Sequence, residues 1–522
     1  MYDSETIHNL MKQRVRFSSE HEAIFDYDTG KGYTYGDMET RSDKLAHFLV
    51  NVLGLQKGDR IGFCAVNHVA MFDAWFTTFK TGIIITTYNC LLKETELLTL
   101  IDNEAPKVIF YTREVAAGAE AMKMLGFEQE FICLDDDVET TDKYKYSDIM
   151  SLTDYTVPAP PELDYEDIQM LIHTGGTTGI PKAAKLSFRS LFYNQLVEVL
   201  YLQVTENDTA IQMLPLFHTA GWNVVCLPVL SAGGRLILTR SFAPDNLLEI
   251  IRTERPTIGI SVETIFKAIA NHPGFAEADL SCYRFLLVGA APTGKELLER
   301  YWNKGVKMVN SYGMTEIGPN NMSHPIGMMS IDDVRKKWNS CGKPAPFNEL
   351  RLLDDDGNEV AQGEKGELVF RGKLLFSGYW NNPEATEKMF DNGWVHTGDV
   401  GYLDKDGFCY ISGRKKNMFI SGGENIFTQE ICDVISTLDG IDDVFIVGVP
   451  DEKWGEVGRA LVVLSKGSKV TADDIKMTVK KNLSTIKMPK YVTFLDAIPK
   501  NAVGKYDLVT IKERFGNIPD AY

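Results

Sequence analysis

Short apolar runs alternate with helical patterns up to about residue 340, and this alternation is the strongest constraint on the fold. The runs at 107–111, 168–172, 235–238 and 285–288 have the length of buried strands, and Gly, Pro or Thr follows each of them closely. Strands that alternate with helices in this way build layered α/β domains with largely parallel sheets. The sequence therefore predicts an α/β fold for this part of the chain.

The pattern changes near residue 349. The runs at 351–353, 367–370 and 408–411 are short and are separated by Asp-Asp-Gly and Asp-Gly turns, which predict a small antiparallel β subdomain. Beyond residue 413, a strand at 444–447 and a helix over 472–483 predict a last unit with α+β structure. About 110 residues are enough for a separate small domain.

Charge and cysteine usage exclude several classes of protein. Lys and Arg total 54 and Asp and Glu total 72, so the net charge of −18 disfavours nucleic acid and anionic membrane surfaces as partners. The eight cysteines are scattered without a Cys-x-x-Cys pair, which indicates a reduced, cytoplasmic protein without a structural zinc site. The most apolar stretch, 71–92, contains Asp73 and Lys80, so we expect a buried core segment and no transmembrane segment.

Two glycine-rich loops follow predicted strands and compete as phosphate sites. The loop 174–182 reads Thr-Gly-Gly-Thr-Thr-Gly-Ile-Pro-Lys, whose backbone N–H groups, hydroxyls and Lys182 suit a polyphosphate, although a flexible surface turn is an equal alternative. The loop 289–296 matches Gly-x-x-x-x-Gly-Lys but ends in Glu296, where a P-loop needs Ser or Thr to hold magnesium. A P-loop NTPase is therefore disfavoured.

Three further motifs carry chemistry, each with a plainer structural alternative. In 312–316 the Tyr312 ring can stack on a base, the Thr315 hydroxyl can bind a phosphate, and Glu316 can hold Mg²⁺. Gly398-Asp399, with Gly413-Arg414, suits ribose hydroxyls, although a role in a hairpin turn is the favoured explanation of Asp399 by itself. Lys505 follows Gly504 near the end of the chain, where a lone lysine is normally a solvated surface charge.

Together these motifs resemble the adenylate-forming superfamily in order and spacing, from about residue 20 to about residue 510. That superfamily contains acyl-CoA synthetases, adenylation domains of peptide synthetases, and luciferases. Supporting stretches lie at 214–218, 378–386, 421–426 and 449–452, and the resemblance is greatest to the CoA ligases of fatty and aryl acids. It implies a large N-terminal domain, 1–415, with layered α/β sheets and an antiparallel β subdomain, and a small mobile α+β domain, 416–522.

The resemblance also implies a role for each matching position. Catalysis would rest on Lys505, Thr315, Glu316 and Lys182, with Glu316 and Thr174 as the ligands of Mg²⁺. The ATP- and AMP-binding residues would be Thr174, Gly175, Gly176, Thr177, Thr178, Gly179, Lys182, Ala290, Ala291, Pro292, Asn310, Ser311, Tyr312, Gly313, Thr315, Asp399, Arg414 and Lys505. Lys416 would be the hinge, Gly422 and Gly423 would line the CoA tunnel, and His218, Ala220, Gly289 and Ile317 would line the acyl pocket.

The activity implied is ATP-dependent formation of an acyl-adenylate from a hydrophobic acid, followed by thioester formation with CoA and release of AMP and pyrophosphate. A fatty acid is expected first and an aryl acid next, because residues 214–223 contain no carboxylate to pair an amino group. We expect the apolar wall of the pocket from Phe217, Trp222, Val262, Phe266, Ile317 and Met322. The alternatives are an adenylation enzyme that loads a carrier protein and a catalytically silent nucleotide-binding protein. A homodimer is compatible with the sequence.

Overall fold

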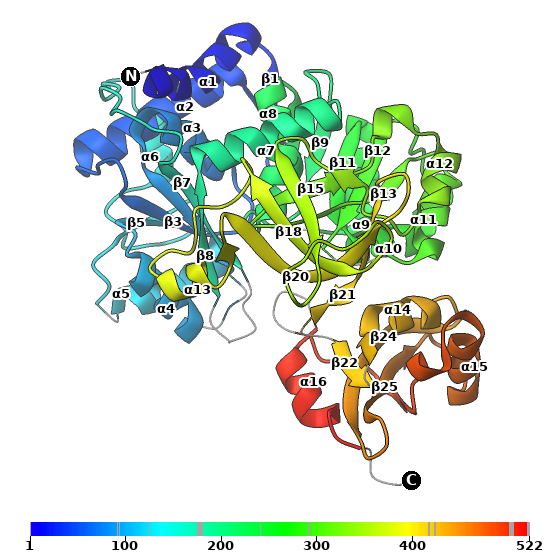
Figure 1. The fold of residues 1–522 in the computed structure, drawn as a ribbon. Helices are drawn as coiled ribbons and strands as arrows, with labels where there is room; N and C mark the ends of the chain where they lie inside the picture. The colour runs from blue at the N-terminus through cyan, green and yellow to red at the C-terminus, as the bar shows by residue number, and fades with distance from the viewer. Residues whose placement is uncertain are drawn as a thin grey trace.

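Two mixed sheets of mostly parallel strands form the framework of the large domain (Figure 1). They belong to a computed structural model that describes residues 2–90, 92, 94–124, 126–174, 181–240, 242–290, 293–415, 418–421, 424–500 and 506–518. The predicted α/β architecture is confirmed, since the runs at 107–111, 168–172, 235–238 and 285–288 all form strands of these two sheets.

The first sheet has seven strands in the order β13-β12-β11-β9-β10-β1-β2, and only β1 and β2 pair antiparallel. Its strands are β1 (Glu22–Asp26), β2 (Lys31–Thr34), β9 (Thr209–Gln212), β10 (Arg235–Leu238), β11 (Ile258–Val262), β12 (Phe285–Gly289) and β13 (Met308–Asn310). The second sheet has six strands in the order β6-β5-β3-β4-β7-β8, and only β7 and β8 pair antiparallel. These are β3 (Arg60–Cys64), β4 (Ile84–Thr87), β5 (Val108–Tyr111), β6 (Glu130–Cys133), β7 (Ile168–Thr174) and β8 (Lys182–Ser187).

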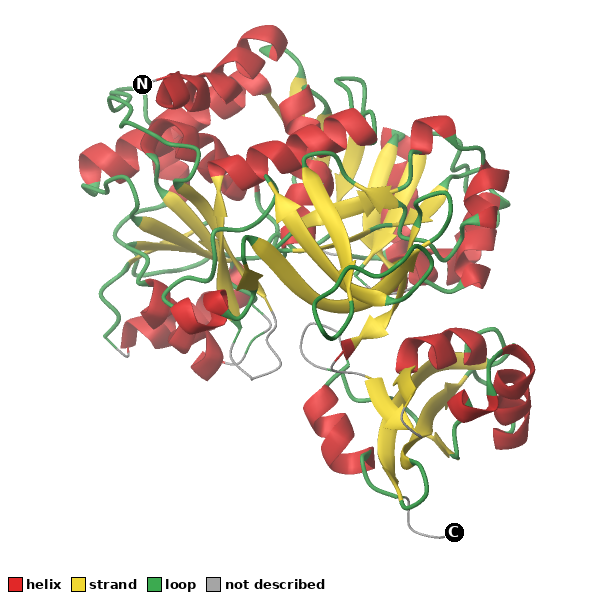
Figure 2. Ribbon diagram, in the orientation of Figure 1, coloured by secondary structure: helices red, strands yellow, loops and turns green. Residues whose placement is uncertain are grey.

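Helices cover both sheets, as the red ribbons of Figure 2 show. In the large domain they are α1 (Tyr2–Ser18), α2 (Tyr35–His47), α3 (Val69–Thr81), α4 (Glu94–Glu104), α5 (Ala116–Met124), α6 (Tyr146–Ser151), α7 (Phe188–Tyr201), α8 (Leu227–Ala232), α9 (Pro244–Glu254), α10 (Glu263–Asn271), α11 (Lys295–Trp302), α12 (Ile331–Lys336) and α13 (Pro383–Glu387). A π-helix, η3 (Gly221–Cys226), runs directly into α8. The predicted core segment 71–92 is buried through α3 and β4, and within the described residues no helix is long and apolar enough to cross a membrane.

The predicted antiparallel subdomain is also confirmed. A three-stranded sheet contains β14 (Tyr312–Met314), β15 (Gly318–Ser323) and β16 (Lys343–Pro344). A five-stranded sheet contains β17 (Asn348–Leu353), β18 (Gly366–Gly372), β19 (Phe390–Asp391), β20 (Trp394–Leu403) and β21 (Cys409–Arg414). Its strands pair antiparallel throughout, so the Asp-Gly turns join neighbouring strands, as expected for hairpins.

The C-terminal unit has its own sheet and its own two apolar cores. The strands are β22 (Met418–Ser421), β23 (Glu424–Phe427), β24 (Ile441–Asp451), β25 (Gly455–Leu464) and β26 (Tyr491–Phe494), and the helices are α14 (Thr428–Ile435), α15 (Ala472–Asn482) and α16 (Leu508–Phe515). One core lies under α14 and α15 and the other under α16. In Figure 1 this unit lies below the large domain, and it follows β21 in the chain.

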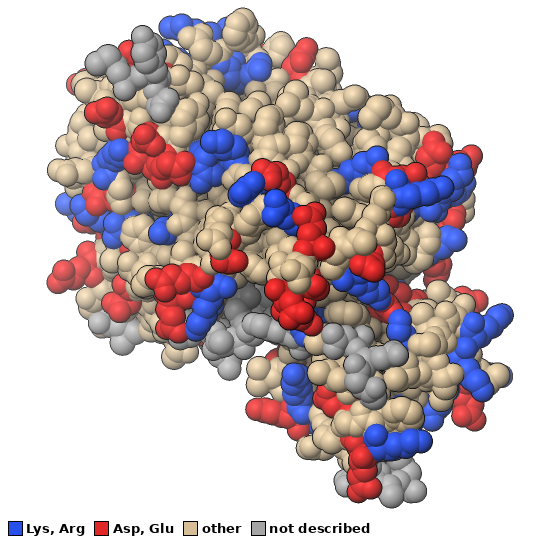
Figure 3. Space-filling view, in the orientation of Figure 1, with Lys and Arg blue, Asp and Glu red and all other residues tan. Residues whose placement is uncertain are grey.

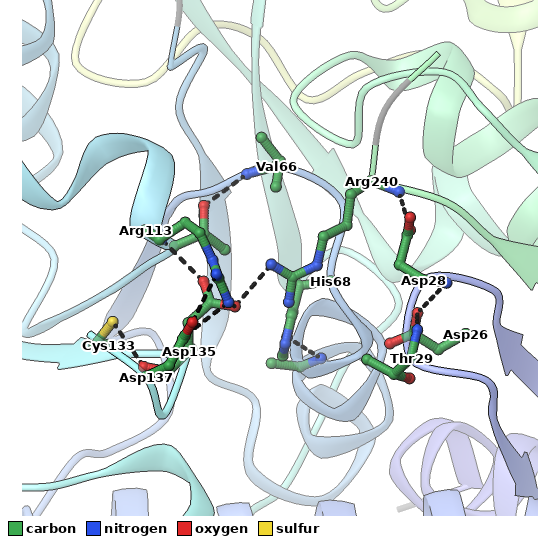
Figure 4. A network of polar contacts seen from close by, with 12 residues as sticks. Asp26, Asp28, Thr29, Val66, His68, Arg113, Cys133, Asp135, Asp137 and Arg240 are labelled. Atoms are coloured by element: carbon green, nitrogen blue, oxygen red, sulfur yellow. Dashed lines mark hydrogen bonds and ion pairs between the residues drawn. The ribbon is translucent and has the colours of Figure 1, made fainter. Parts of the chain in front are cut away.

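A polar network joins loops at the carboxyl ends of strands from the two large sheets (Figure 4). Arg240, just beyond β10, donates from Nη1 to Oδ1 of Asp135, just beyond β6, at 2.7 Å, and its backbone N–H donates to Asp28 beyond β1. Arg113 reaches Asp135 through its backbone N–H at 2.9 Å and also pairs with Asp137. Burial raises the pKa of Asp135, but these hydrogen bonds outweigh it and hold the pKa below its usual value.

We expect Asp135→Ala to destabilise the large domain by about 3–5 kcal/mol, because the Asp135 carboxylate is only 3% exposed and its removal takes the shared acceptor from the Arg240 guanidinium and from the Arg113 backbone N–H. Asp137→Ala is the matched control and should cost less than about 1 kcal/mol, since that carboxylate is 64% exposed. Urea unfolding followed by tryptophan fluorescence measures the difference. The contribution of Asp135 should be lost as the pH falls through its depressed pKa. Equal shifts in the two variants would contradict this assignment.

Candidate active site

Three of the predicted residues and one unforeseen tyrosine meet where β7 and β8 approach the segment 378–380. Trp380 donates its backbone N–H to Ala183 O at 2.8 Å, which pairs this segment with β8. The Tyr379 ring consequently lies beneath Lys182, whose Nζ is 5.3 Å from the ring centroid. The Tyr379 hydroxyl donates to Glu316 Oε1 at 2.7 Å, and Thr174, opposite Lys182 in the β7–β8 ladder, also hydrogen-bonds this tyrosine.

The charges of this group are set by burial. Desolvation, followed by the neighbouring Glu316, raises the pKa of Tyr379, so its phenol stays neutral and can donate to the carboxylate. Glu316 is 4% exposed, and the next residue, Ile317, is fully buried directly before β15. The site therefore has an anionic side, formed by Glu316, and a cationic side, formed by Lys182.

Mg²⁺ fits the oxygens of this group. Glu316 and Thr174 supply the hard carboxylate and hydroxyl donors that Mg²⁺ prefers. Among the described residues there is no group of three or more His, Cys, Asp or Glu side chains placed to hold a metal ion. A site with one or two protein oxygens suits Mg²⁺, which keeps several waters and takes its remaining ligands from substrate phosphates.

A second group lies at the pairing of β20 with β21. Asp399 and Arg414 are cross-strand partners, and Arg414 Nε donates to Asp399 Oδ1 at 2.8 Å. The other carboxylate oxygen, Oδ2, accepts from the Tyr312 hydroxyl at 2.7 Å. The charge of Asp399 raises the pKa of Arg414, and burial raises that of Tyr312. The predicted trio Tyr312, Asp399 and Arg414 is therefore brought together, with an acidic acceptor suited to hydroxyl groups.

Close backbone contacts explain the small residues of the predicted nucleotide site. A Cβ on Gly313 would lie 2.4 Å from Gly318 O, so only glycine allows β14 and β15 to approach this closely. Ala290, directly after β12, has a left-handed φ of 70°, which is uncommon for a residue with a side chain. Asn310 is buried and donates to Trp338 O at 2.7 Å, which fixes the end of β13 before Ser311.

The predicted acyl-pocket residues lie at three places in the chain: the end of β12, the start of β15 and the start of η3. Gly289 ends β12, Ile317 is fully buried before β15, and the half-buried His218 and Ala220 precede η3. The loop that leads to His218 is held by Asn67, which donates to Leu214 O at 3.0 Å and accepts from Leu216 N–H at 2.9 Å.

Phe266, one of the residues expected in the apolar wall, lies on α10. Its ring packs against Tyr301 of α11 with a centroid distance of 5.5 Å, beneath the outer helices. Trp222 packs instead against Phe72 of α3 at 5.3 Å and is fully buried. Both rings therefore pack in the core, and their place in the acyl wall stays a prediction.

The start of β24 in the small domain contacts α10 of the large domain. Lys500 and Tyr506, which flank Lys505 in the chain, both contact Asp443 of β24, at 2.7 Å and 2.5 Å. Lys267 of α10 pairs with Asp442, the residue before, at 3.1 Å. The face shown in Figure 3 carries interspersed acidic and basic side chains on both domains.

Several predicted residues lie outside the described part of the chain. They are Gly175, Gly176, Thr177, Thr178 and Gly179 of the first loop, Ala291 and Pro292, the hinge Lys416, Gly422 and Gly423, and Lys505. Their roles stay predictions. The residue that the sequence did not single out is Tyr379, although it lies within the stretch 378–386 that supports the family resemblance.

Comparison with known proteins places the chain in a family. The sequence model described as AMP-binding enzyme matches residues 11–380, and that of the AMP-binding enzyme C-terminal domain matches 430–505. Feruloyl-CoA synthase of Amycolatopsis sp is 34% identical over 495 residues, covering 93% of this chain and 95% of the relative. Long-chain-fatty-acid–CoA ligase FadD13 of Mycobacterium tuberculosis is 30% identical over 509 residues, covering 97% of this chain and 98% of the relative.

A solved structure agrees over almost the whole chain. ATP-bound MatB from Rhodopseudomonas palustris superposes with a TM-score of 0.87 at 27% identity, over 98% of this chain and 99% of the MatB chain. The motifs, the two groups of side chains and the sequence match point the same way: the chain belongs to the AMP-binding enzymes, the adenylate-forming superfamily of the acyl-CoA synthetases.

Proposed function

We propose that this chain is an AMP-forming acid–thiol ligase that activates a hydrophobic carboxylic acid and transfers it to CoA. In the first step a carboxylate oxygen attacks the α-phosphorus of ATP, and the bond to the β-phosphate breaks, so that pyrophosphate leaves. In the second step the thiol of CoA loses its proton and attacks the acyl carbon, and AMP leaves. The products are the acyl-CoA thioester, AMP and pyrophosphate.

The observation that carries this proposal is the pairing of a phosphate-and-metal group with a ribose group. Thr174, Lys182 and Glu316 converge on Tyr379. Asp399, held by Arg414 and Tyr312, offers an acceptor for ribose hydroxyls. A nucleotide spanning both groups would have its phosphates beside Lys182. Mg²⁺ bound by Glu316 and Thr174 would screen the charge of those phosphates.

The remaining roles follow from charge and position. Two anions, the acid and the α-phosphate, must approach each other, so a cation must neutralise them in the transition state. Lys505 is assigned this role, and Thr315 is assigned contact with the α-phosphate. Lys500 and Tyr506, which flank Lys505 in the chain, both contact Asp443 of β24, next to the Asp442 that pairs with Lys267 of α10. We place the boundary between the domains at 415/416, with Lys416 as the hinge. Rotation of the small domain about this hinge would withdraw Lys505 after adenylate formation and bring Gly422 and Gly423 to the CoA tunnel.

The substrate is proposed to be a hydrophobic acid without an α-amino group. The loop 214–223 carries no carboxylate, and Ile317, Trp222 and Met322 are fully buried apolar residues. Burying an ammonium without a partner is costly, whereas each methylene buried in an apolar pocket contributes about 0.8 kcal/mol. The relatives named for feruloyl-CoA and long-chain fatty acyl-CoA synthesis support an aryl or a long aliphatic acid. All eight cysteines are free, which supports the cytoplasm as the location.

The proposed function is tested by the ratio of pyrophosphate formed to CoA consumed. Pyrophosphate should appear only when ATP, Mg²⁺ and a carboxylic acid are all present, and CoA should be consumed in a ratio of one to one with pyrophosphate. The measurement couples pyrophosphate detection to loss of free thiol, with a panel of acids from acetate to palmitate, cinnamate and several amino acids. Orthophosphate release without any acid would support an NTPase. Pyrophosphate release that leaves CoA untouched would favour loading of a carrier protein, and no nucleotide turnover would favour a silent binding protein.

A further inference from the structure

A buried histidine and a buried glutamate form a pair next to the phosphate-and-metal group, and the proposed mechanism uses neither of them. His173 is the residue before Thr174 on β7, and its Nε2 lies 2.6 Å from Glu104 Oε1 at the end of α4. Both side chains are at most 5% exposed. Burial lowers the pKa of His173, but Glu104 outweighs this effect and holds the pKa above its usual value. The two side chains therefore form an ion pair inside the large domain.

Hydrogen bonds fix both members of this pair. His173 Nδ1 donates to Thr87 O of β4 at 2.9 Å, and the ring of Tyr88 stacks on the imidazole with 5.3 Å between the centroids. The second oxygen of Glu104, Oε2, accepts from the Thr86 hydroxyl at 2.7 Å. The neighbouring strands β4 and β7 are thus joined through Glu104 as well as through their backbone ladder. Because every polar atom of the pair has a partner, the orientation of both side chains is fixed.

The end of α4 also holds the segment that pairs with β8. Arg60 of β3 donates from Nε to Glu104 O at 2.7 Å, and its guanidinium lies over the Trp380 ring at 5.3 Å from the centroid. Asn381 donates from Nδ2 to Asn103 O at 3.0 Å. One helix end therefore supports both β7 and the segment that lies beside β8.

Successive side chains of these two stretches lie on opposite faces of the sheet, as the pleat of a strand requires. His173 and Trp380 lie on the face toward α4, where Trp380 packs with Leu171, two residues before His173 on β7. Thr174 and Tyr379 lie on the other face and hydrogen-bond each other. The same two stretches of chain therefore carry the support on one face and the phosphate-and-metal group on the other.

Stability of the fold does not require an ion pair at this place. An apolar pair of the same volume would stabilise a core about as well, because both charges lose their hydration on burial. What the pair adds is direction, since a charge-assisted hydrogen bond of 2.6 Å allows one arrangement of the two side chains, whereas apolar contacts allow several. The pair lies one residue from Thr174, where the predicted phosphate loop begins.

We propose that Glu104 and His173 are positioning residues, which hold Thr174 and the segment of Tyr379 in the geometry that binds the β- and γ-phosphates of ATP. This inference rests on the proposed function and adds two residues to its phosphate site. The two side chains act through β7 and through the end of α4, without contact to the nucleotide. An acyl-adenylate carries only the α-phosphate, so thioester formation from it does not depend on this support.

The experiment compares Glu104→Gln with the unmodified protein in the two half-reactions. The amide keeps the size of the side chain but not the charge that pairs with His173. We expect the KM for MgATP in pyrophosphate release to rise about tenfold while kcat stays within about threefold, because the β- and γ-phosphates bind in the ground state as well as in the transition state. Thioester formation from a supplied acyl-adenylate should stay within about twofold of normal. Thr86→Val removes only one hydrogen bond to Glu104, so it should raise the KM for MgATP about threefold.

Asp73→Asn is the matched control. Asp73 of α3 is a fully buried carboxylate that pairs with Arg41 of α2 at 2.6 Å, so it has the burial of Glu104 and a cationic partner, but its partner lies neither on β7 nor on α4. This variant should lower the midpoint of thermal unfolding as Glu104→Gln does. Its KM for MgATP should stay within about twofold of normal.

Two results would overturn the inference. One is a KM for MgATP in Glu104→Gln equal to that in Asp73→Asn, which would make the pair a support of the fold alone, and the other is an equal loss in both half-reactions. If Glu104→Gln does not fold, Thr86→Val replaces it, and an unchanged KM for MgATP overturns the inference.

The proposed function can fail separately from this inference. If the unmodified protein releases no pyrophosphate with any acid, the proposed function falls, and calorimetric titration with MgATP decides the inference alone. The Kd for MgATP should then be about tenfold higher in Glu104→Gln than in the unmodified protein. Equal Kd values in the two proteins would overturn the inference.

Discussion

Replacing Lys505 with alanine is expected to slow acyl-adenylate formation about 10²- to 10³-fold while leaving thioester formation from a supplied acyl-adenylate within about threefold of normal. The reason is that the two half-reactions carry different charges. The first brings a carboxylate against a phosphate, and its transition state needs a fixed cation. The second joins a thiol to an already activated acyl group and releases AMP, so this lysine would have no comparable role.

The measurement runs the two half-reactions separately, with pyrophosphate exchange for the first and a synthetic acyl-adenylate for the second. Lys500→Ala is the matched control, because Lys500 belongs to the same loop but is engaged by Asp443 at 2.7 Å. It should change either rate by less than about threefold, in keeping with a partly exposed ion pair. Equal losses in both half-reactions of Lys505→Ala would contradict a role confined to adenylate formation.

The strands were predictable because each lies in a short apolar run bounded by turn residues. The runs at 107–111 and 235–238 became β5 and β10 almost without change of limits. The helix expected over 472–483 is α15, and it starts with the capping box between Thr471 and Asp474. These features depend on neighbours in sequence, so local patterns were enough to find them.

Contacts between distant segments were not predictable in this way. Tyr379 reaches Glu316 only because Trp380 and Gly378 pair with β8, a pairing of residues nearly two hundred positions apart. Phe266 occupies an apolar helix position, and the pattern does not tell which neighbour that face meets. The burial of Glu198 on α7 is another example. A single glutamate in a helix is normally exposed, and only packing of α7 against β15 buries it.

The network around Asp135 also depends on contacts that local sequence patterns do not predict. Arg113, Asp135 and Arg240 follow three different strands, and nothing in their spacing signals that they meet. Parallel strands of each sheet place their carboxyl ends at one edge, so the topology, once known, explains the meeting. The sequence thus predicts which loops carry polar groups, whereas the packing of the two sheets decides which of those groups become partners.

Glu316→Gln is expected to lower kcat/KM for MgATP about 100-fold and to raise the Mg²⁺ concentration needed for half-maximal rate. The substitution keeps the size of the side chain, and the amide oxygen can still accept from the Tyr379 hydroxyl, now 2.7 Å from Glu316 Oε1. What is lost is the negative charge, which is the property a hard divalent cation requires of its ligand. The effect should therefore appear in the Mg²⁺ dependence more than in the stability of the fold.

Tyr379→Phe separates the metal-binding role of Glu316 from its hydrogen bond. This variant removes the hydroxyl but keeps the ring under Lys182, whose Nζ lies 5.3 Å from the centroid. Because a single hydrogen bond to a carboxylate contributes about 1.5–3 kcal/mol, the loss of rate should lie between about 10- and 150-fold, and the Mg²⁺ dependence should be unchanged. The measurement is the initial rate of pyrophosphate release across a Mg²⁺ titration at fixed ATP. An unaltered Mg²⁺ dependence in Glu316→Gln would remove this carboxylate from the metal site and leave it as a support for Tyr379.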